Sequence, residues 1–236
     1  MIAAIIQARM GSTRLPGKVL MDLCGKPVLE HIIDRIKYSR SIDKIIVATT
    51  DSEKDKAIIT LSRKCGVETF AGSEMDVLDR YYRAASEYEV DTIVRITADD
   101  PLKDPEVIDK VINSYFQNNG QIDYASNTIK PTYPLGLDTE VFSLKGLERA
   151  WKESDEQYDR EHVTPYIWRN PQIFRLHNVT NDEDLSNLRW TLDTDDDLEF
   201  MKQIYTALYH EGEIFLMKDI LDLLKKNPEM SRVNVE

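Results

Sequence analysis

The feature that most constrains this chain is an alternation of short apolar runs and longer amphipathic segments through its first 118 residues. The apolar runs are rich in Ile and Val and end in polar or turn-forming residues, as buried strands do. They lie at Ile2–Gln7, Lys44–Thr49, Val67–Phe70 and Thr92–Thr97. Helices are predicted between and after them, at Val28–Tyr38, after Ser52, at Val77–Tyr88 and at Pro105–Asn118. This order predicts a three-layer α/β/α fold with a mostly parallel sheet.

The pattern is looser after residue 118. Strands are predicted at Leu137–Ser143 and Phe174–Val179, and helices at Leu144–Trp151, His162–Trp168, Asp196–His210 and Met217–Lys226. No repeat, low-complexity tract or Gly/Ser linker marks a second independent domain. We therefore expect residues 1–236 to form a single domain.

Charge and composition exclude several classes of protein. The 236 residues carry 42 acidic against 30 basic side chains, a net charge of −12, which argues against a nucleic-acid partner. No apolar run approaches the roughly 18–20 residues of a membrane span, and Ile2–Ile6 is too short for a secretory leader, so a cytoplasmic protein without a membrane partner is expected. Cys24 and Cys65 are isolated, which predicts reduced thiols packed in the core.

The segment after the first predicted strand concentrates positive charge in an acidic chain. Residues 7–18 contain Arg9, Arg14 and Lys18 together with two glycines and two hydroxyl side chains. Glycines allow backbone N–H groups to converge, and the cations neutralise a polyanion, so a phosphate cradle is predicted; a solvated basic turn is the alternative. Five residues separate Gly11 from Gly17, so the loop is not a Walker A motif.

Carboxylates follow two apolar runs. Asp99 and Asp100 come after Thr92–Thr97, and the group Asp193, Asp195, Asp196 and Asp197 comes after residues 190–192. If both groups lie at the carboxyl edge of the sheet, they form an oxygen-ligand site for a hard cation such as Mg²⁺. We favour Asp99 and Asp193 as ligands, whereas capping of the following helix explains Asp196 and Asp197 equally well.

Several segments resemble the cytidylyltransferases that activate sugar acids, a family that contains CMP-Kdo and CMP-sialate synthetases. The closest branch is the SpsF-like one of spore coat polysaccharide biosynthesis. The segments that carry the resemblance are Ile6–Lys18, Gly25–Pro27, Gly72–Tyr81, Thr97–Leu102, Gly136–Phe142 and Arg160–Tyr166. The resemblance spans nearly the whole chain and implies a glycosyltransferase-A-like nucleotidyltransferase fold, dependence on Mg²⁺ and a homodimer.

The resemblance also implies a nucleotide site. Arg9 and Lys18 resemble triphosphate ligands, Ser12 and Arg14 shape the loop, and Ala8 lies against the base. Gly72, Ser73 and Asp76 match the turn that reads base and ribose. The implied nucleotide-binding set is therefore Ala8, Arg9, Gly11, Ser12, Arg14, Lys18, Gly72, Ser73 and Asp76.

Metal and acceptor sites are implied in the same way. Asp99 and Asp193 match the two metal ligands, and Asp195 adds a ligand directly or through water, because the sialate enzymes often have an acid there. Acceptor contacts are implied for Gly136, Asp138, Glu140, Arg160 and His162. A structural role for His162 is the alternative, and Arg160 or Lys130 would meet the carboxylate of a sugar acid. His31, His177 and His210 receive no role, and Trp151, Trp168 and Trp190 are expected in core or interface packing.

These observations lead to one hypothesis. An acceptor hydroxyl or phosphate oxygen attacks the α-phosphorus of a nucleoside triphosphate, CTP by resemblance, and releases pyrophosphate, with Arg9, Lys18, Asp99 and Asp193 as the catalytic groups. Residues 1–118 would bind the nucleotide, and residues from about 119 to 190 the acceptor and a second subunit. The alternatives are a sugar-1-phosphate nucleotidylyltransferase, a glycosyltransferase with Asp193-Thr194-Asp195 as its metal motif, and a non-catalytic nucleotide-binding protein.

Overall fold

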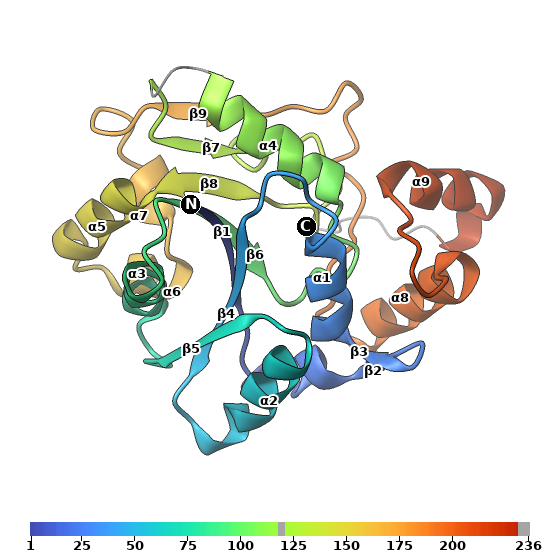
Figure 1. The fold of residues 1–236 in the computed structure, drawn as a ribbon. Helices are drawn as coiled ribbons and strands as arrows, with labels where there is room; N and C mark the ends of the chain where they lie inside the picture. Colours follow the sequence, from blue (N-terminus) through green and yellow to red (C-terminus); the bar gives the residue numbers. More distant parts are fainter. Residues whose placement is uncertain (118–120, 231–236) are drawn as a thin grey trace.

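A seven-stranded sheet forms the centre of the protein (Figure 1). The computed structural model describes residues 1–117 and 121–230. The strands, in spatial order, are β5 (Glu68–Gly72), β4 (Lys44–Thr50), β1 (Ile2–Gln7), β6 (Thr92–Thr97), β8 (Glu140–Ser143), β7 (Tyr124–Ser126) and β9 (Leu176–Asn178). A separate two-stranded ribbon joins β2 (Asp22–Leu23) to β3 (Lys26–Pro27).

The half of the sheet formed by β5, β4, β1 and β6 is parallel, as the alternation predicts. Ile5 of β1 pairs with Ile46 of β4 on one side and with Arg95 of β6 on the other. Side chains along β1 are buried from Ala3 to Ile6 because helices cover both faces of the sheet. Parallel strands end at the same edge, so the segments that follow β1 and β6 emerge side by side.

The other half of the sheet is mixed. β8 runs antiparallel to both β6 and β7, whereas β9 runs parallel to β7. The sequence patterns missed β7 and predicted longer versions of β8 and β9, since short edge strands carry little periodic signal. In register, Glu140 of β8 lies opposite Arg95 of β6. This pairing joins the segment Gly136–Phe142, in which acceptor contacts are expected, to the parallel half of the sheet.

Two helical layers cover the sheet (Figure 1). One buried cluster contains apolar residues of α1 (Val28–Ile36), α2 (Lys56–Lys64), α4 (Pro105–Gln117), α8 (Asp195–Leu208) and α9 (Met217–Lys226). The opposite cluster contains those of α3 (Val77–Glu87), α5 (Leu144–Glu153) and α7 (Pro165–Trp168). The predicted α/β/α layering is therefore confirmed.

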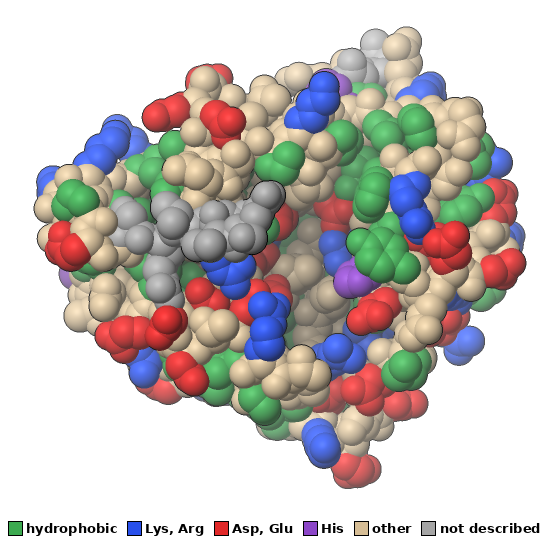
Figure 2. Space-filling view, turned by 180° about the vertical axis from the view of Figure 1, so that it is seen from behind, with side chains coloured by type: hydrophobic (Ala, Val, Ile, Leu, Met, Phe, Trp, Pro, Cys, Tyr) green, Lys and Arg blue, Asp and Glu red, His purple; other side chains and the backbone are tan. Residues whose placement is uncertain are grey.

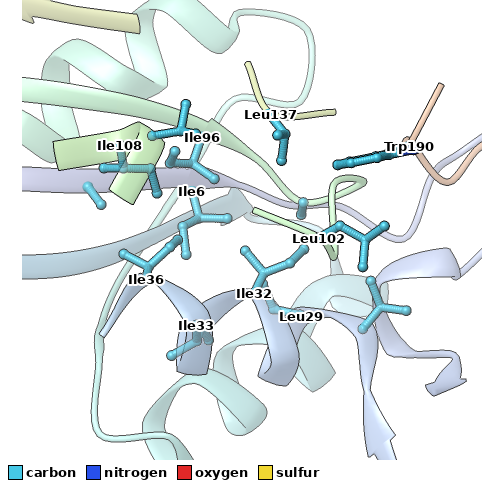
Figure 3. Packing of buried hydrophobic residues seen from close by; sticks show 14 of the residues in the cluster. Ile6, Leu29, Ile32, Ile33, Ile36, Ile96, Leu102, Ile108, Leu137 and Trp190 are labelled. Atoms are coloured by element: carbon cyan, nitrogen blue, oxygen red, sulfur yellow. The ribbon is translucent and has the colours of Figure 1, made fainter. Parts of the chain in front are cut away.

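The packing of α1 shows how the apolar spacing produces this layering. Leu29, Ile32, Ile33 and Ile36 lie on one face of the helix, against Ile6 and Ile96 of the sheet (Figure 3). All four are fully buried. Burying such a side chain contributes roughly 1.5–3 kcal/mol. The face of α1 that packs on the sheet thus fixes the position of the basic loop and the β2–β3 ribbon, which come just before it.

Two expectations are wrong for local backbone reasons. One helix is predicted at His162–Trp168, but the structure has two, α6 (Gln157–His162) and α7. They are separated at Val163, which has a φ of 74°, and α7 begins at Pro165. Cys24 is exposed and not in the core, and Cys65 is partly buried. Cys24 and Gly25 form the two-residue turn between β2 and β3, and both have positive φ, as such tight hairpins require.

A strand-like contact between two distant loops orients the segment that carries Asp193. The backbone of Leu135 joins the two loops: its N–H donates to the Leu188 carbonyl at 2.9 Å, and its carbonyl accepts from the Trp190 N–H at 2.7 Å. Gly136 has a φ of +110°, and a Cβ there would lie 2.4 Å from the Trp190 carbonyl oxygen. Gly136 is therefore needed for this close approach. Among the described residues, no helix is both long and apolar enough to cross a membrane.

We predict that Gly136→Ala destabilises the protein more than Gly212→Ala. Gly212 also has a positive φ, +82°, but a Cβ there meets nothing within 4 Å. Gly212→Ala should cost about 1–2 kcal/mol for the left-handed backbone alone, whereas Gly136→Ala adds roughly 1–3 kcal/mol of steric overlap. Urea unfolding of both variants measures the difference. Equal losses of unfolding free energy would contradict the proposed close approach.

Candidate active site

The basic loop after β1 is folded tightly by its own backbone. The Gly17 N–H donates to the Met10 carbonyl at 3.0 Å, and the Met10 N–H donates to Oδ1 of Asp55 at 2.8 Å. Gly17 has a φ of 73° and begins the 3₁₀ helix Lys18–Leu20. Glycine permits this left-handed turn. The turn directs Lys18 back toward the carboxyl edge of the sheet.

Lys18 joins two distant aspartates. Its Nζ lies 3.0 Å from Oδ2 of Asp99, 3.0 Å from Oδ1 of Asp193 and 2.8 Å from the Leu192 carbonyl oxygen. Only 11% of the Lys18 side chain is exposed. Each proton of the ammonium group thus has an acceptor, as a buried charge requires. Three segments separated by up to 175 residues meet at this nitrogen.

Asp193 is surrounded by further cations. Its Oδ1 also contacts Nη2 of Arg14 at 2.9 Å, and its Oδ2 accepts from Nη2 of Arg189 at 2.9 Å. Burial by itself would raise the pKa of Asp193, but the hydrogen bond and charge of Lys18, with Arg189 and Arg14, hold the pKa below its ordinary value. Asp193 is thus a carboxylate kept ionised by its neighbours.

The two acids after β6 have different surroundings. Asp99 faces Lys18, and its backbone carbonyl accepts from the Leu192 N–H at 2.7 Å, which ties the two carboxylate-bearing segments together. Asp100 is buried and accepts from Thr97 Oγ1 at 2.7 Å and from Lys103 at 2.9 Å. Burial raises the pKa of Asp100 to about 7. Asp100 therefore belongs to the interior, and Asp99 to the site.

The donor set fits a hard divalent cation. Oxygens of Asp99 and Asp193 already converge on one positive group, the Lys18 ammonium. Two carboxylates suit Mg²⁺, which usually takes one or two from the protein and completes its shell with water and phosphate oxygens. Among the described residues, no group of three or more His, Cys, Asp or Glu side chains gathers closely enough to hold a metal. Asp195 is exposed in the first turn of α8, so it does not extend this pair to a triad.

The other acids after Trp190 cap a helix. Oδ2 of Asp197 accepts from the N–H groups of Asp193 and Thr194, both at 3.0 Å, and Thr194 Oγ1 accepts from the Asp197 N–H at 3.2 Å. This reciprocal pair is a capping box at the start of α8. It satisfies backbone donors next to Asp193 and so fixes the direction of that side chain. Capping, the alternative role for Asp197, is what the structure shows.

Two cavities share a wall beside this cluster. The nucleotide-side cavity has a volume of about 400 Å³, and its lining includes Ala8, Arg9, Ser12, Arg14, Lys18, Val77, Arg80, Asp99 and Asp193. The smaller cavity, of about 200 Å³, is lined by Arg95, Thr97, Thr128, Asp138, Glu140, Tyr158, His162, Thr164, Pro165 and Trp168. Arg95, Thr97 and His162 line both. Figure 2 shows a hollow in one face of the molecule where acidic and basic side chains lie side by side.

The turn predicted to read the base lies behind the nucleotide-side cavity. Gly72, Ser73 and Asp76 are not among its lining residues, but Arg80 is, and Nη1 of Arg80 donates to the Ser73 carbonyl at 2.9 Å. A Cβ on Gly72 would lie 3.4 Å from Cγ of Arg80. Gly11 also lies outside the lining, where a Cβ would be 3.3 Å from Oε1 of Glu74. These residues position the lining and do not form it.

Arg160 has a different environment from the one expected. Its Nε and Nη2 both donate to Oδ2 of Asp76, at 2.9 and 2.5 Å, and its Nη1 donates to the Trp151 carbonyl at 2.7 Å. Asp76 in turn caps α3 through the Asp79 N–H at 2.8 Å. Arg160 lines neither cavity, and its contacts join α6 to the start of α3.

The smaller cavity contains three of the five predicted acceptor residues, namely Asp138, Glu140 and His162. Gly136 lies against Trp190 instead. Sequence reasoning missed Arg95, Thr128, Tyr158 and Thr164, because nothing in their local pattern separates them from ordinary strand and helix residues. Trp168 was expected in packing, but it lines this cavity with 40% of its surface exposed, whereas Trp190 is fully buried.

Glu140 and Arg95 form a buried ion pair in the wall between the cavities. Nη1 of Arg95 donates to Oε2 of Glu140, and Oε1 accepts from Tyr124 at 2.5 Å and from Thr164 at 2.6 Å. Burial opposes ionisation of Glu140, but the charge of Arg95 and these hydrogen bonds leave its pKa below the ordinary value. The two charges therefore balance each other, whereas the buried Nε of Arg95 has no hydrogen-bond partner among the described residues.

The fold and this cluster define a class of protein, the α/β nucleotidyltransferases, in which a basic loop and two strand-end carboxylates meet beside a cavity. A family model described as cytidylyltransferase matches residues 3–220. The chain belongs to the cytidylyltransferase family.

Individual relatives agree with this assignment. The chain is 43% identical over 237 residues to a protein of Methanocaldococcus jannaschii, covering 99% of this chain and 94% of the relative. It is 34% identical to the spore coat polysaccharide biosynthesis protein SpsF of Bacillus subtilis, covering 97% and 95%. A solved cytidylyltransferase from Leptospira borgpetersenii superposes with a TM-score of 0.94 at 34% identity, covering 100% and 98%. A CMP-Kdo synthetase solved with CTP shares the fold, with a TM-score of 0.65 at 16% identity over 87% and 98% of the chains.

The depressed pKa of Asp193 predicts how Asp193→Asn responds to acid. A carboxylate with a lowered folded-state pKa stabilises the fold at neutral pH, and this stabilisation is lost as the pH falls through that pKa. We expect the variant to lose about 1–2 kcal/mol of unfolding free energy at pH 7, and the deficit to shrink as the pH falls below the ordinary aspartate pKa and through the lowered pKa of Asp193. Urea titrations followed by tryptophan fluorescence measure this difference in unfolding free energy. A difference that stays constant with pH would show that the ionisation of Asp193 does not stabilise the fold.

Proposed function

We propose that the protein transfers CMP from CTP to a sugar or sugar acid, with Mg²⁺ as cofactor and pyrophosphate as the second product. The observation that carries the proposal is the Lys18 ammonium held between Asp99 and Asp193 at the wall of the larger cavity. Cations and carboxylates next to each other are what a metal-bound polyphosphate needs. The product would serve surface polysaccharide synthesis, as the name of the Bacillus relative suggests.

The cations of the basic loop are suited to the triphosphate. Arg14 is 63% exposed and pairs with Asp193 at 2.9 Å, and Arg9 contacts Glu74 at 3.7 Å, so both side chains lie at the open side of the loop, where a ligand can reach them. Together with Lys18 they would neutralise the phosphates and stabilise the departing pyrophosphate. Transfer of this kind depends mostly on positioning and electrostatics, and no covalent enzyme intermediate is needed.

The carboxylates and the smaller cavity complete the site. Asp99 and Asp193 would hold Mg²⁺, which supplies positive charge at the phosphates when bound. The acceptor would occupy the smaller cavity, against Asp138, Glu140 and His162, because this cavity shares a wall with the nucleotide side. Gly136 and Arg160 would act indirectly, by holding the Asp193 segment and α6 in place.

CTP is favoured over other nucleotides by family membership, and the solved relative named as a CTP complex has the same fold. Ala8 would lie against the base, with Gly72, Ser73 and Asp76 behind Arg80. A homodimer in the cytoplasm is part of the same proposal. Light scattering of the purified protein tests its oligomeric state.

A pyrophosphate-release assay with each of CTP, UTP, GTP and ATP tests the nucleotide. We expect turnover with CTP and Mg²⁺ and a hydroxyl-bearing sugar, and none after chelation of the metal. Turnover with a sugar 1-phosphate and another nucleotide would establish the sugar-1-phosphate nucleotidylyltransferase. Cleavage of a nucleotide sugar without pyrophosphate would establish the glycosyltransferase, and CTP binding without turnover on any acceptor would establish the non-catalytic protein.

Substitutions in the cluster should reduce this activity strongly. Lys18→Ala and Asp99→Asn each remove one preorganised charge, which should cost on the order of 10²–10³ in rate. Lys218→Ala is the matched control, because Lys218 is exposed on α9 and lines neither cavity. Near-normal pyrophosphate release by Lys18→Ala would show that the cluster is not the catalytic site.

A further inference from the structure

The wall between the two cavities contains a guanidinium group that the protein uses only in part. Arg95 lines both cavities, and 15% of its side chain is exposed. Its Nη1 donates to Oε2 of Glu140. Its Nε is buried and has no hydrogen-bond partner among the described residues, and within the same residues nothing accepts from Nη2, which is not buried. Because a guanidinium has five N–H donors, Arg95 retains donors for a ligand.

Glu140, the partner of Arg95, has little left to offer a ligand. Its Oε2 accepts from Arg95, and its Oε1 accepts from Tyr124 at 2.5 Å and from Thr164 at 2.6 Å. The Glu140 side chain is only 8% exposed. The wall therefore presents unused donors beside a carboxylate whose oxygens are engaged. Since a buried donor costs free energy until it is paired, a ligand that supplies acceptor oxygens fits this wall.

The same ion pair fixes the guanidinium in position. Arg95 of β6 and Glu140 of β8 lie opposite each other in the sheet register. The planar arrangement of guanidinium donors matches the two oxygens of a carboxylate. Less side-chain freedom is lost on binding when the group is already held by the protein. Arg95 is thus prepared to receive an anion.

Asp138 lies in the lining of the smaller cavity, and its surroundings reduce its negative charge. Burial raises the pKa of this carboxyl group, and the charges of Lys103 and Arg95 offset only part of the rise. A carboxyl group with a raised pKa is protonated more often, and it then donates one hydrogen bond. An anion beside Arg95 therefore meets less repulsion from Asp138 than it would from an exposed aspartate.

Other cations near the smaller cavity do not line it. Arg160 and Lys130 lie outside its lining. Arg169 is also outside the lining and is paired with Asp159. Among the described residues that line the smaller cavity, Arg95 is the one Lys or Arg. A carboxylate in this cavity would therefore find its permanent positive charge in Arg95.

We propose that Arg95 binds the carboxylate of a sugar-acid acceptor through the N–H donors that Glu140 leaves unused. The inference rests on the proposed function and names the residue that recognises its acceptor. In a 2-keto sugar acid such as Kdo, the carboxylate is attached to the carbon that bears the attacking hydroxyl. A carboxylate held at the shared wall therefore places that hydroxyl next to the nucleotide side.

Removal of the acceptor's charge tests the proposal. Kdo and N-acetylneuraminate are compared with their methyl esters, which keep the sugar ring and lose the carboxylate. Saturation-transfer NMR on the full chain, with Mg²⁺ and α,β-methylene-CTP, detects millimolar binding without turnover. For the wild type we expect at least one of the acids to bind about tenfold or more tightly than its ester, because a hydrogen bond to a charged group is lost in the ester.

Two variants remove the unused donors in different ways. Arg95→Lys keeps a positive charge opposite Glu140 but loses the planar set of donors, so the preference for the acid should fall below about threefold. The double variant Arg95→Met with Glu140→Gln removes both charges together, which avoids leaving Glu140 buried without its cation. It should bind acid and ester alike.

Arg63→Lys is the matched control, because Arg63 is exposed on α2 and lines neither cavity. It should keep the preference of the wild type. The proposal is overturned if acid and ester bind the wild type equally, if neither acid binds, or if the double variant still prefers the acid.

CTP binding, measured by calorimetry, separates this proposal from the proposed function and from a role of Arg95 at the triphosphate. Both variants should bind CTP within about threefold of the wild type, which also shows that they are folded. A loss of about tenfold or more in CTP affinity, with the preference for the acid intact, would assign Arg95 to the nucleotide and overturn the proposal. A wild type that does not bind CTP would refute the cytidylyltransferase activity. Equal binding of acid and ester with CTP binding intact would refute the role of Arg95 alone.

Discussion

The contact on which the site depends is the Lys18 ammonium group, held by Asp99, Asp193 and the Leu192 carbonyl. Burying one ammonium costs several kcal/mol unless its partners are placed well. Here the partners come from the end of β6 and from the loop before α8, so the charge is satisfied only when the whole sheet and the C-terminal segment are assembled. The buried ammonium group needs carboxylates close to it, and meeting this need places cations and carboxylates together at one cavity.

Charge is distributed differently on the two sides of the cleft. The nucleotide side receives Arg9, Arg14 and Lys18 from a single loop, in a chain whose net charge is −12. In the lining of the smaller cavity, Arg95 is paired with Glu140. Arg95, Thr97 and His162 form the wall that the two cavities share.

Much of the site could be predicted from local patterns. The position of Asp99 after a buried strand, and of Lys18 in a glycine-containing loop after another, follows from the rule that parallel strands end at a common edge. Arg160 and Trp168 could not be placed in this way. Arg160 pairs with Asp76, 84 residues away. Trp168 lines the smaller cavity from α7, which Val163 and Pro165 separate from α6. Neither position can be read from the spacing of apolar residues, because one depends on a contact between distant residues and the other on a single backbone angle.

By itself, the sequence determined the alternating strands and helices, the basic loop and the acids at strand ends, because these follow from apolar periodicity and from residue chemistry over a few neighbouring positions. Only the tertiary structure decided which charges are already paired. Arg95 is paired with Glu140 from an antiparallel neighbour, and Lys18 bridges two aspartates. Pairing of charges depends on distances in space between segments far apart in the chain, and no local pattern encodes those distances.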